Sequence, residues 1–386
     1  MNVQVVLGYN MSKTVSLANN TIVFFALIRA GLWEEEVSLL DYEEIDYQEL
    51  YNLVDEQAVF GLVAAGLEHV VDVKVPKEIV LQFVGRTLQI EEQNKAMNSF
   101  IGVLVEKMRK ADIYTLMVKG QGVAQCYERP LWRSSGDVDF YLSEDNFKKA
   151  KSFFRPLVRS FDPDTESAKH INMHYNPWVV EIHVNQNCSL SGRINRVMDD
   201  VHKDLFYAGN VRSARIGGTT VFLPSADNDV LIIFTHFLNH FYKGGLGIRQ
   251  ICDWCRFLWT YKDSIKRDLL QKRLKEAGLM TIWKAFAALA VDCLGMPAEA
   301  MPFYEEKKRW QRKAEKIKKF IIEVGNFGHN REAAYNEKQP RLVRKALSFS
   351  RRLGDLLHHA SIFPWDSFRF LFGITNSGIK AVMHGE

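Results

Sequence analysis

The sequence predicts an α+β fold in which a small mixed sheet lies between an N-terminal and a C-terminal helical region. Helical periodicity dominates residues 15–110 and 225–356, whereas short apolar runs with strand character are concentrated between them. We therefore expect an N-terminal helical region over 1–110, a core with the sheet over 111–224 and a C-terminal helical domain over 225–386.

Composition limits the class of protein. The 386 residues are 47% hydrophobic and 25% charged, which is enough apolar material for a sizeable core. The 50 Lys and Arg residues and the 46 Asp and Glu residues give a net charge of only +4, far below the basic excess of a dedicated nucleic-acid binder. The overall charge therefore indicates no particular partner.

Targeting signals and cysteine usage favour a cytoplasmic location. The five cysteines are few, odd in number and scattered, unlike a secreted disulfide framework. Lys13 and a polar run precede the first apolar block, so no signal peptide is expected. That block, Thr21–Ile28, ends at Arg29 and is much shorter than the roughly 20 apolar residues of a membrane span. We expect a buried helix there and no membrane span.

The rest of the N-terminal region continues the helical pattern. Asp46–His69 places apolar residues near one face, as a helical pattern does. Pro76 stands where proline is favoured, at the start of a long amphipathic helix that ends at Lys110. These helices should cover the core that follows them.

After residue 110 the spacing of the apolar residues is no longer helical throughout, and short runs with strand character appear. The elements expected next are a strand at Tyr114–Val118, a helix at Gln121–Tyr127, a strand at Val138–Leu142, a helix capped by Ser143 over Glu144–Leu157, and strands at Ile171–Tyr175 and Val179–Val184. A hairpin with Gly217–Gly218 at its turn should follow, and then helices to about Leu356. Ile362–Phe372 is aromatic and shows no clear period.

Three carboxylates stand out against this pattern. Asp137 and Asp139, at i and i+2 on a predicted strand, leave the same face about 6.5–7 Å apart. Such a pair suits a two-metal site for phosphoryl or nucleotidyl displacement, although two solvated carboxylates at a strand end would look the same. Glu181 lies within another apolar strand, where it needs either a metal or a salt bridge to Lys or Arg.

Positive charge is predicted around these acids. Lys119 precedes Gly120 at a strand end, and Arg133 lies four residues before the first aspartate. Both side chains are suited to phosphate oxygens. The alternatives are that Lys119 caps its strand in solvent and that Arg133 pairs with Glu128 or Asp137.

Other polar residues support less specific interpretations. His170, His174 and His183, together with Glu181, contain zinc or iron ligand types but follow no recognisable metal spacing. His183 lies two residues after Glu181, faces the same side and is a candidate supporting residue. The Cys252 and Cys255 pair lies in a helical pattern with no second pair nearby, which favours a place in the core.

A basic run lies towards the C-terminus. Its residues are Lys307, Lys308, Arg309, Arg312, Lys313, Lys316, Lys318 and Lys319, with Arg341, Arg344, Lys345, Arg351 and Arg352 further on. Such a run can attract an anionic partner, but Glu315 and Glu323 interrupt it and favour a solvated helix face.

Taken together, the motifs between about residues 110 and 260 have a specific spacing. They are Lys119, Gly120, Ala124, Tyr127, Pro130, Arg133, Gly136, Asp137, Val138, Asp139, Phe140, His170, His174, Val180, Glu181, Ile182, His183, His236, Arg249 and Asp253. This pattern resembles the bacterial family of uncharacterised nucleotidyltransferases, within the polymerase-beta-like nucleotidyltransferase superfamily.

The resemblance implies roles for individual residues. Asp137 and Asp139 would bind the metals, and Glu181 would help the nucleophile lose its proton. Gly120 would form the glycine turn that lets the triphosphate approach. Gln121 departs from the Gly or Ser usual at the next position, so the phosphate contact would pass to other residues. The candidates are Lys119, Arg133, Ser134 and Ser135.

The expected function is therefore a nucleotidyltransferase that uses Mg²⁺ or Mn²⁺. It would move a nucleoside monophosphate from an NTP to an unknown acceptor, a small molecule, a protein or RNA, and release pyrophosphate. A metal-dependent glycosyltransferase with a D-x-D motif is one alternative, although about 110 helical residues precede the motif here. A catalytically inactive nucleotide-binding module is the other.

Overall fold

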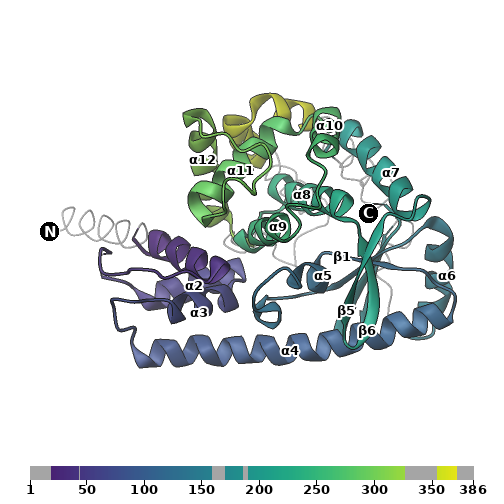
Figure 1. The fold of residues 1–386 in the computed structure, drawn as a ribbon, viewed down its shortest axis with the longest axis horizontal. Coiled ribbons are helices and arrows are strands. Elements are labelled where there is room, and N and C mark those ends of the chain that lie inside the picture. Colours follow the sequence, from purple (N-terminus) through teal and green to yellow (C-terminus); the bar gives the residue numbers. More distant parts are fainter. Residues whose placement is uncertain (1–18, 43, 159–169, 186–189, 327–353, 372–386) are drawn as a thin grey trace, which may run out of the picture.

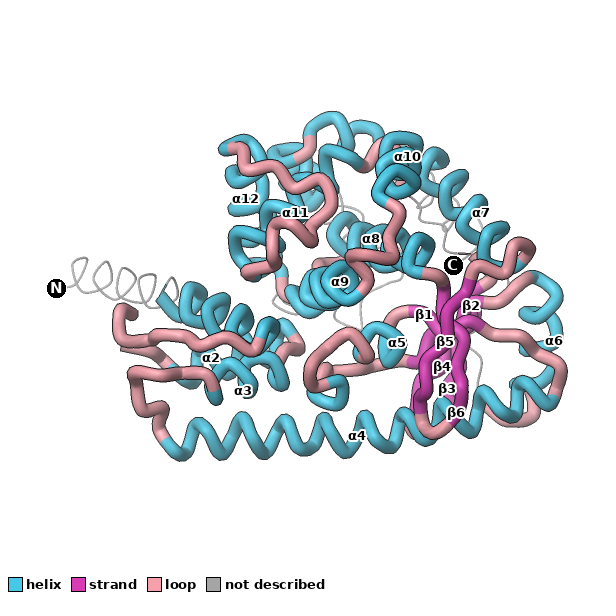
Figure 2. Tube along the Cα trace, in the orientation of Figure 1, coloured by secondary structure: helices cyan, strands magenta, loops and turns pink. Residues whose placement is uncertain are grey.

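The computed structural model describes residues 19–42, 44–158, 170–185, 190–326 and 354–371 (Figure 1). Helices make up most of these residues, and the strands gather in one part of the molecule (Figure 2). A small mixed sheet flanked by helices confirms the predicted α+β class.

The N-terminal helices begin with a buried helix over residues 19–33. The next helices are α2 (Tyr47–Gln57), α3 (Phe60–Glu68) and α4 (Lys77–Lys110). The helical pattern expected over 46–69 is present and is divided between α2 and α3, because Ala58 adopts a left-handed conformation with φ 54° and ends α2. Asp46 begins α2 by accepting hydrogen bonds from the backbone N–H groups of Gln48 and Glu49.

Helix α4 extends along one side of the molecule, beneath α2 and α3 at one end and the β5–β6 hairpin at the other (Figure 1). Its 34 residues give it a length of about 50 Å at about 1.5 Å per residue. Phe83 near its start packs into the core of the helical region, whereas Met97 and Met108 pack against the sheet. The helix therefore connects two parts of the interior.

The mixed sheet is built from strands in the order β1-β2-β4-β3. The elements that build it are β1 (Leu116–Val118), α5 (Gly120–Ala124), the 3₁₀ turn η1 (Pro130–Trp132), β2 (Val138–Tyr141), α6 (Glu144–Phe154), β3 (His170–Tyr175) and β4 (Trp178–His183). β2 and β4 are parallel, and the two outer pairs are antiparallel. The predicted strands are thus present, and Ser143 caps α6 as expected.

A helix and a hairpin follow the sheet: α7 (Gly192–Phe206), β5 (Val211–Ile216) and β6 (Thr219–Pro224). Gly217 and Gly218 have φ values of 57° and 79°, as a tight hairpin turn requires. A Cβ on Gly217 would lie 1.9 Å from the carbonyl oxygen of Asn98, so only glycine allows the turn to lie against α4. The hairpin was predicted, and α7 was not.

The C-terminal helices are α8 (Ala226–Lys243), α9 (Ile248–Thr260), α10 (Arg267–Ala277), α11 (Met280–Leu294) and α12 (Lys308–Val324). The aromatic segment without clear period is also helical, over residues 354–362 and 364–371. Its period was hidden because aromatic side chains such as Phe363 and Phe370 are buried while Trp365 and Phe368 are exposed.

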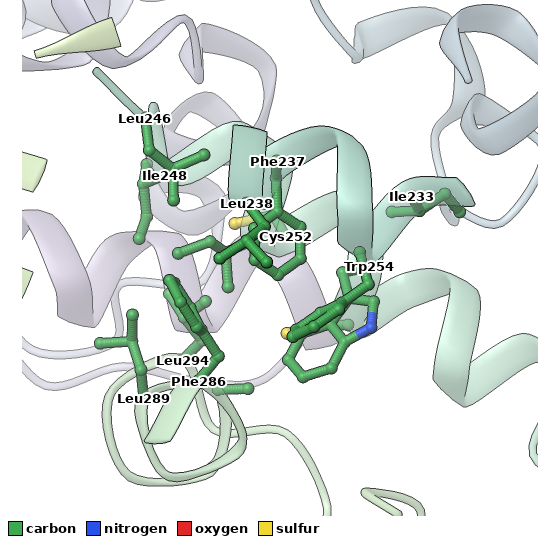
Figure 3. Close-up of a cluster of buried hydrophobic side chains, with 14 of the residues drawn as sticks. Ile233, Phe237, Leu238, Leu246, Ile248, Cys252, Trp254, Phe286, Leu289 and Leu294 are labelled. Atoms are coloured by element: carbon green, nitrogen blue, oxygen red, sulfur yellow. The ribbon is translucent and has the colours of Figure 1, made fainter. Parts of the chain in front are cut away.

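The described residues form two hydrophobic clusters in the interior. The larger one joins the N-terminal helices to α7–α12, and Figure 3 shows its centre, where Phe237 of α8, Trp254 of α9 and Phe286 of α11 lie together. The smaller one lies between α4, α6, the mixed sheet and the hairpin. The side chains discussed below lie where the mixed sheet approaches α8 and α9.

Candidate metal and nucleotide site

The acidic residues are brought together by the parallel pairing of β2 with β4. Asp139 lies directly opposite Glu181 in this register, so two strands present one carboxylate each at neighbouring positions. Asp137 stands one residue before β2 and lines the same cavity, which has a volume of about 190 Å³. The structure thus brings the three predicted acids to one place.

The most compact group of ligand atoms differs from the predicted one. Asp139, Glu181 and His183 each offer one ligand atom, and these atoms lie within 4.8 Å of one another. His183 Nε2 is 3.0 Å from Asp139 Oδ1 and 3.4 Å from Glu181 Oε2. Among the described residues this is the one group that could hold a metal ion, and Asp137 lies outside it. His183 is therefore a candidate ligand as well as a supporting residue.

Lys119 is a buried partner of the acids and does not cap its strand in solvent. Its ammonium lies 2.8 Å from Asp139 Oδ1, and its side chain is only 13% exposed. The backbone turns sharply here, because Lys119 has φ 56° and Gly120 has φ 39° where β1 leads into α5. This turn directs the lysine back over the sheet, towards Asp139.

The charges of the cluster shift its pKa values in opposite directions. Burial raises the pKa of Asp137, and the nearby charges of Asp139 and Glu181 raise it further. Burial would also raise the pKa of Asp139, but Lys119 and His183 hold it well below its usual range. Asp139 is thus a stable anion, whereas the negative charge on Asp137 has no ion-pair partner among the described residues.

The alternative interpretation of Arg133, a salt bridge to Glu128 or Asp137, is wrong. Its guanidinium binds Asp253 of α9 through two hydrogen bonds of 2.7 Å, from Nε to Oδ1 and from Nη2 to Oδ2. Tyr127 donates a third to the same carboxylate at 2.7 Å. Glu128 is instead bound by Arg256. Arg133 still lines the cavity, but most of its donors are engaged.

The predicted serines lie in the loop between η1 and β2. Ser135 Oγ accepts hydrogen bonds from Gln121 Nε2 at 3.0 Å and from Arg133 Nη1 at 3.1 Å. The backbone carbonyl of Ser134 accepts one from Arg249. Gln121, which departs from the family's usual residue, is buried and also donates to Asn94 of α4. It orders the loop instead of contacting the cavity.

Helices α8 and α9 form the cavity wall opposite the sheet. The site residues predicted from the sequence included none from these two helices. Its polar residues are His236, His240, Arg249, Gln250 and Asp253. Three of them, His236, Arg249 and Asp253, belong to the family pattern, but no role followed from it. The available signal was their i, i+4 spacing within otherwise apolar helices, His236 with His240 and Arg249 with Asp253.

The two histidines of this wall are neutral. Their Nε2 atoms are 3.1 Å apart, so one imidazole donates and the other accepts. Burial lowers the pKa of His236 well below its ordinary value. Burial also lowers the pKa of His240 to about 4, and the charges of Lys119, Arg249 and Lys243 act in the same direction.

The remaining candidates from the sequence, the other histidines and the cysteine pair, do not form a metal site. The His170 ring stacks on His183, whereas His174 is exposed, and neither belongs to the compact ligand group. A zinc or iron site made of the three predicted histidines is therefore not supported. Cys252 and Cys255 are buried free thiols in the core, which confirms the core interpretation.

Part of the basic run lies on α12 and is engaged within the protein. Lys313 and Lys316 donate to the backbone carbonyls of Ile362 and Ser361, at the end of helix 354–362. Others on or near α12 pair with acids: Lys307 and Arg309 with Glu305, Lys318 with Glu315, and Lys319 with Glu323. The basic residues between 341 and 352 lie outside the described residues.

A mixed sheet that carries converging acids beside a glycine turn, with basic residues around the cavity, is typical of enzymes that handle nucleotides. The model of a protein family, described as uncharacterised nucleotidyltransferase, matches residues 43–295, and the chain belongs to this family. The match begins well before the region of resemblance expected from the motifs and includes α2–α4. Searches among curated proteins and solved structures give no match. Within the described residues, every helix is too short or too polar for a membrane span.

Proposed function

We propose that this protein transfers a nucleoside monophosphate from an NTP to a hydroxyl or phosphate acceptor and releases pyrophosphate, with a divalent metal bound at the acidic cluster. The convergence of the ligand atoms of Asp139, Glu181 and His183, beside a cavity that the two acids line, carries the proposal in a chain of this family. Asp137 adds a further carboxylate to the same cavity.

The donor set fits a divalent cation. Asp139, Glu181 and His183 would hold it, and Asp137 lines the same cavity as the two acids. When bound, the cation supplies positive charge that offsets phosphate oxygens and acidifies a nearby hydroxyl. Carboxylates suit Mg²⁺ and Mn²⁺ alike, whereas an imidazole in the set favours Mn²⁺. We therefore expect Mn²⁺ to support activity at least as well as Mg²⁺.

The protein's own groups have separate tasks in this proposal. Lys119 holds Asp139 in place through its ion pair and adds positive charge to the phosphate side. Glu181, which is 22% exposed, is placed to accept the proton of the acceptor hydroxyl. Gly120 leaves open space at the turn, since a Cβ there would meet only the carbonyl oxygen of Asp137 at 3.5 Å. Ser134 and Ser135 are not among the residues that line the cavity, and they would act on its phosphate side through the arginines that they bind, Arg249 and Arg133.

The two alternative functions considered from the sequence, a glycosyltransferase and an inactive nucleotide-binding module, are less well supported. A glycosyltransferase would lead with a nucleotide-binding β/α half, but here helices precede a small mixed sheet. An inactive module has no need for several acids in one cavity. The proposal also includes a reducing, cytoplasmic setting, which the free thiols of Cys126, Cys252, Cys255 and Cys293 support.

The test is a panel of labelled NTPs and sugar nucleotides incubated with the protein, Mn²⁺ or Mg²⁺, and a cell extract as the source of acceptor. We expect metal-dependent pyrophosphate release from at least one NTP and no turnover of sugar nucleotides. Glu181→Gln should lower the rate by at least about a hundredfold, since it removes a proton acceptor and a candidate ligand. Turnover of sugar nucleotides alone, or full activity of the Glu181 variant, would contradict the proposal.

A further inference from the structure

The cations around the cavity differ in how far the protein already uses them. Lys119 is paired with Asp139, and Arg133 is paired with Asp253. Arg249, in the first turn of α9, forms no ion pair among the described residues. Its Nη1 donates to the carbonyl of Ser134 at 2.7 Å, and its Nε is buried without a hydrogen-bond partner there.

An arginine in this state is costly unless something binds it. A buried guanidinium without a carboxylate loses hydration and gains little in return. Burial and the neighbouring charge of Arg133 lower the pKa of Arg249, and the charges of Asp253 and Asp137, which act in the opposite direction, do not offset them. Since the side chain lines the cavity, the missing partner can come from a ligand there.

The contact with Ser134 gives the guanidinium a fixed direction. One donor is held by the loop between η1 and β2, and the planar group keeps further donors for a second partner. Such a fork matches the oxygens of a phosphate group. The acids lie on the sheet side of this cavity and Arg249 on the α9 side, so Arg249 faces an anion that enters the cavity from the side opposite the sheet acids.

We infer that Arg249 binds the β- and γ-phosphates of the NTP and thus selects triphosphate over monophosphate. The inference rests on the proposed function, because it names a subsite of the same cavity. In it, Arg133 is a positioning residue that fixes α9 against the loop through Asp253, and the phosphate contact assigned to it from the sequence passes chiefly to Arg249.

The experiment measures the affinity of an NTP, its NMP and inorganic pyrophosphate, each with Mn²⁺, for the wild type, Arg249→Gln and Arg249→Lys. Arg215→Gln is the matched control, because Arg215 is exposed on the hairpin and its guanidinium donates to the carbonyl of Gly218. Arg249→Gln should weaken NTP and pyrophosphate roughly ten- to hundredfold, as expected for lost charged hydrogen bonds, and NMP by less than about threefold. The NTP and pyrophosphate affinities of Arg249→Lys should lie between those of the wild type and Arg249→Gln. Those of the Arg215→Gln control should equal the wild-type values.

A structural role for Arg249 predicts a different result. Loss of NMP and NTP affinity to the same extent, or a lower unfolding temperature of Arg249→Gln without ligand, would overturn the inference. So would unchanged NTP affinity. If the wild type binds no nucleotide, the proposed function fails, and pyrophosphate alone decides: binding that Arg249→Gln loses supports the subsite, and no binding to the wild type overturns it.

Discussion

Two neighbouring polar clusters use the same residue types in opposite ways. In the first, Asp253 has both oxygens bound, by Arg133 and Tyr127. In the second, Asp137, Asp139 and Glu181 share a cavity with one paired lysine. The comparison teaches that burial alone does not identify a functional acid. Acids whose charge exceeds that of their protein partners indicate a site that a cation can complete.

The largest effect on stability should follow from breaking the first cluster, in which Asp253 is bound by Arg133 and Tyr127. Asp253→Ala leaves the buried guanidinium of Arg133 without its partner, which costs about 3–5 kcal/mol of unfolding free energy. Urea denaturation measures it. The double variant Arg133→Met with Asp253→Leu should lose clearly less, because the guanidinium that Asp253→Ala leaves unpaired is removed together with its partner. A loss below about 1 kcal/mol in Asp253→Ala would mean that the cluster is not a structural support.

A smaller effect of opposite sign is expected in the acidic cluster without metal. Asp137→Asn removes a charge that two nearby carboxylates oppose, and should raise the unfolding free energy by up to roughly 2 kcal/mol. Asp139→Asn is the contrasting variant, because it leaves the ammonium of Lys119 without its nearest partner and should lower stability. Thermal unfolding in EDTA compares the two. Destabilisation by Asp137→Asn would show that this carboxylate has a structural partner.

The smallest effect concerns pH. The pKa of His240 is lowered to about 4 in the folded protein, against an ordinary value of 6.5. The unfolded chain therefore binds the proton first, and the contribution of His240 to stability is lost as pH falls from about 6.5 to about 4. His240→Gln should remove this contribution, so the stability gap between wild type and variant should change in that window. A constant gap would contradict the assignment of a neutral imidazole.

The sequence predicted much of the fold because its signals are local. Alternation and turn residues identified the strands and the Gly217–Gly218 hairpin, and a proline marked the start of α4. Ala58 was missed because a left-handed alanine has no sequence signature, and the helices after residue 353 were hidden by exposed aromatic side chains. These two errors concern a single backbone conformation and an exposed surface, where tertiary contacts decide. Helix α7 was missed although its buried residues have helical spacing, as Ile194, Val197 and Val201 show.

The candidate site was only partly visible in the sequence for a similar reason. Asp139 and Glu181 could be paired because each lies on a strand, and spacing fixes the face of a strand. The partner of Arg133 lies 120 residues away on α9, a distance that no local pattern reports. Arg249 belonged to the family pattern, but its lack of a carboxylate partner is a property of the folded protein.

Asn94 connects helix α4, in the N-terminal third of the chain, to the loop beside the candidate site. Its side-chain amide donates to the carbonyls of Leu131 and Arg133, and its oxygen accepts from Gln121. The loop that precedes the acids is thus tethered to a helix from the N-terminal third. A shortened protein that begins at the first strand would lose this tether, whereas the region matched by the family, which starts at residue 43, includes it.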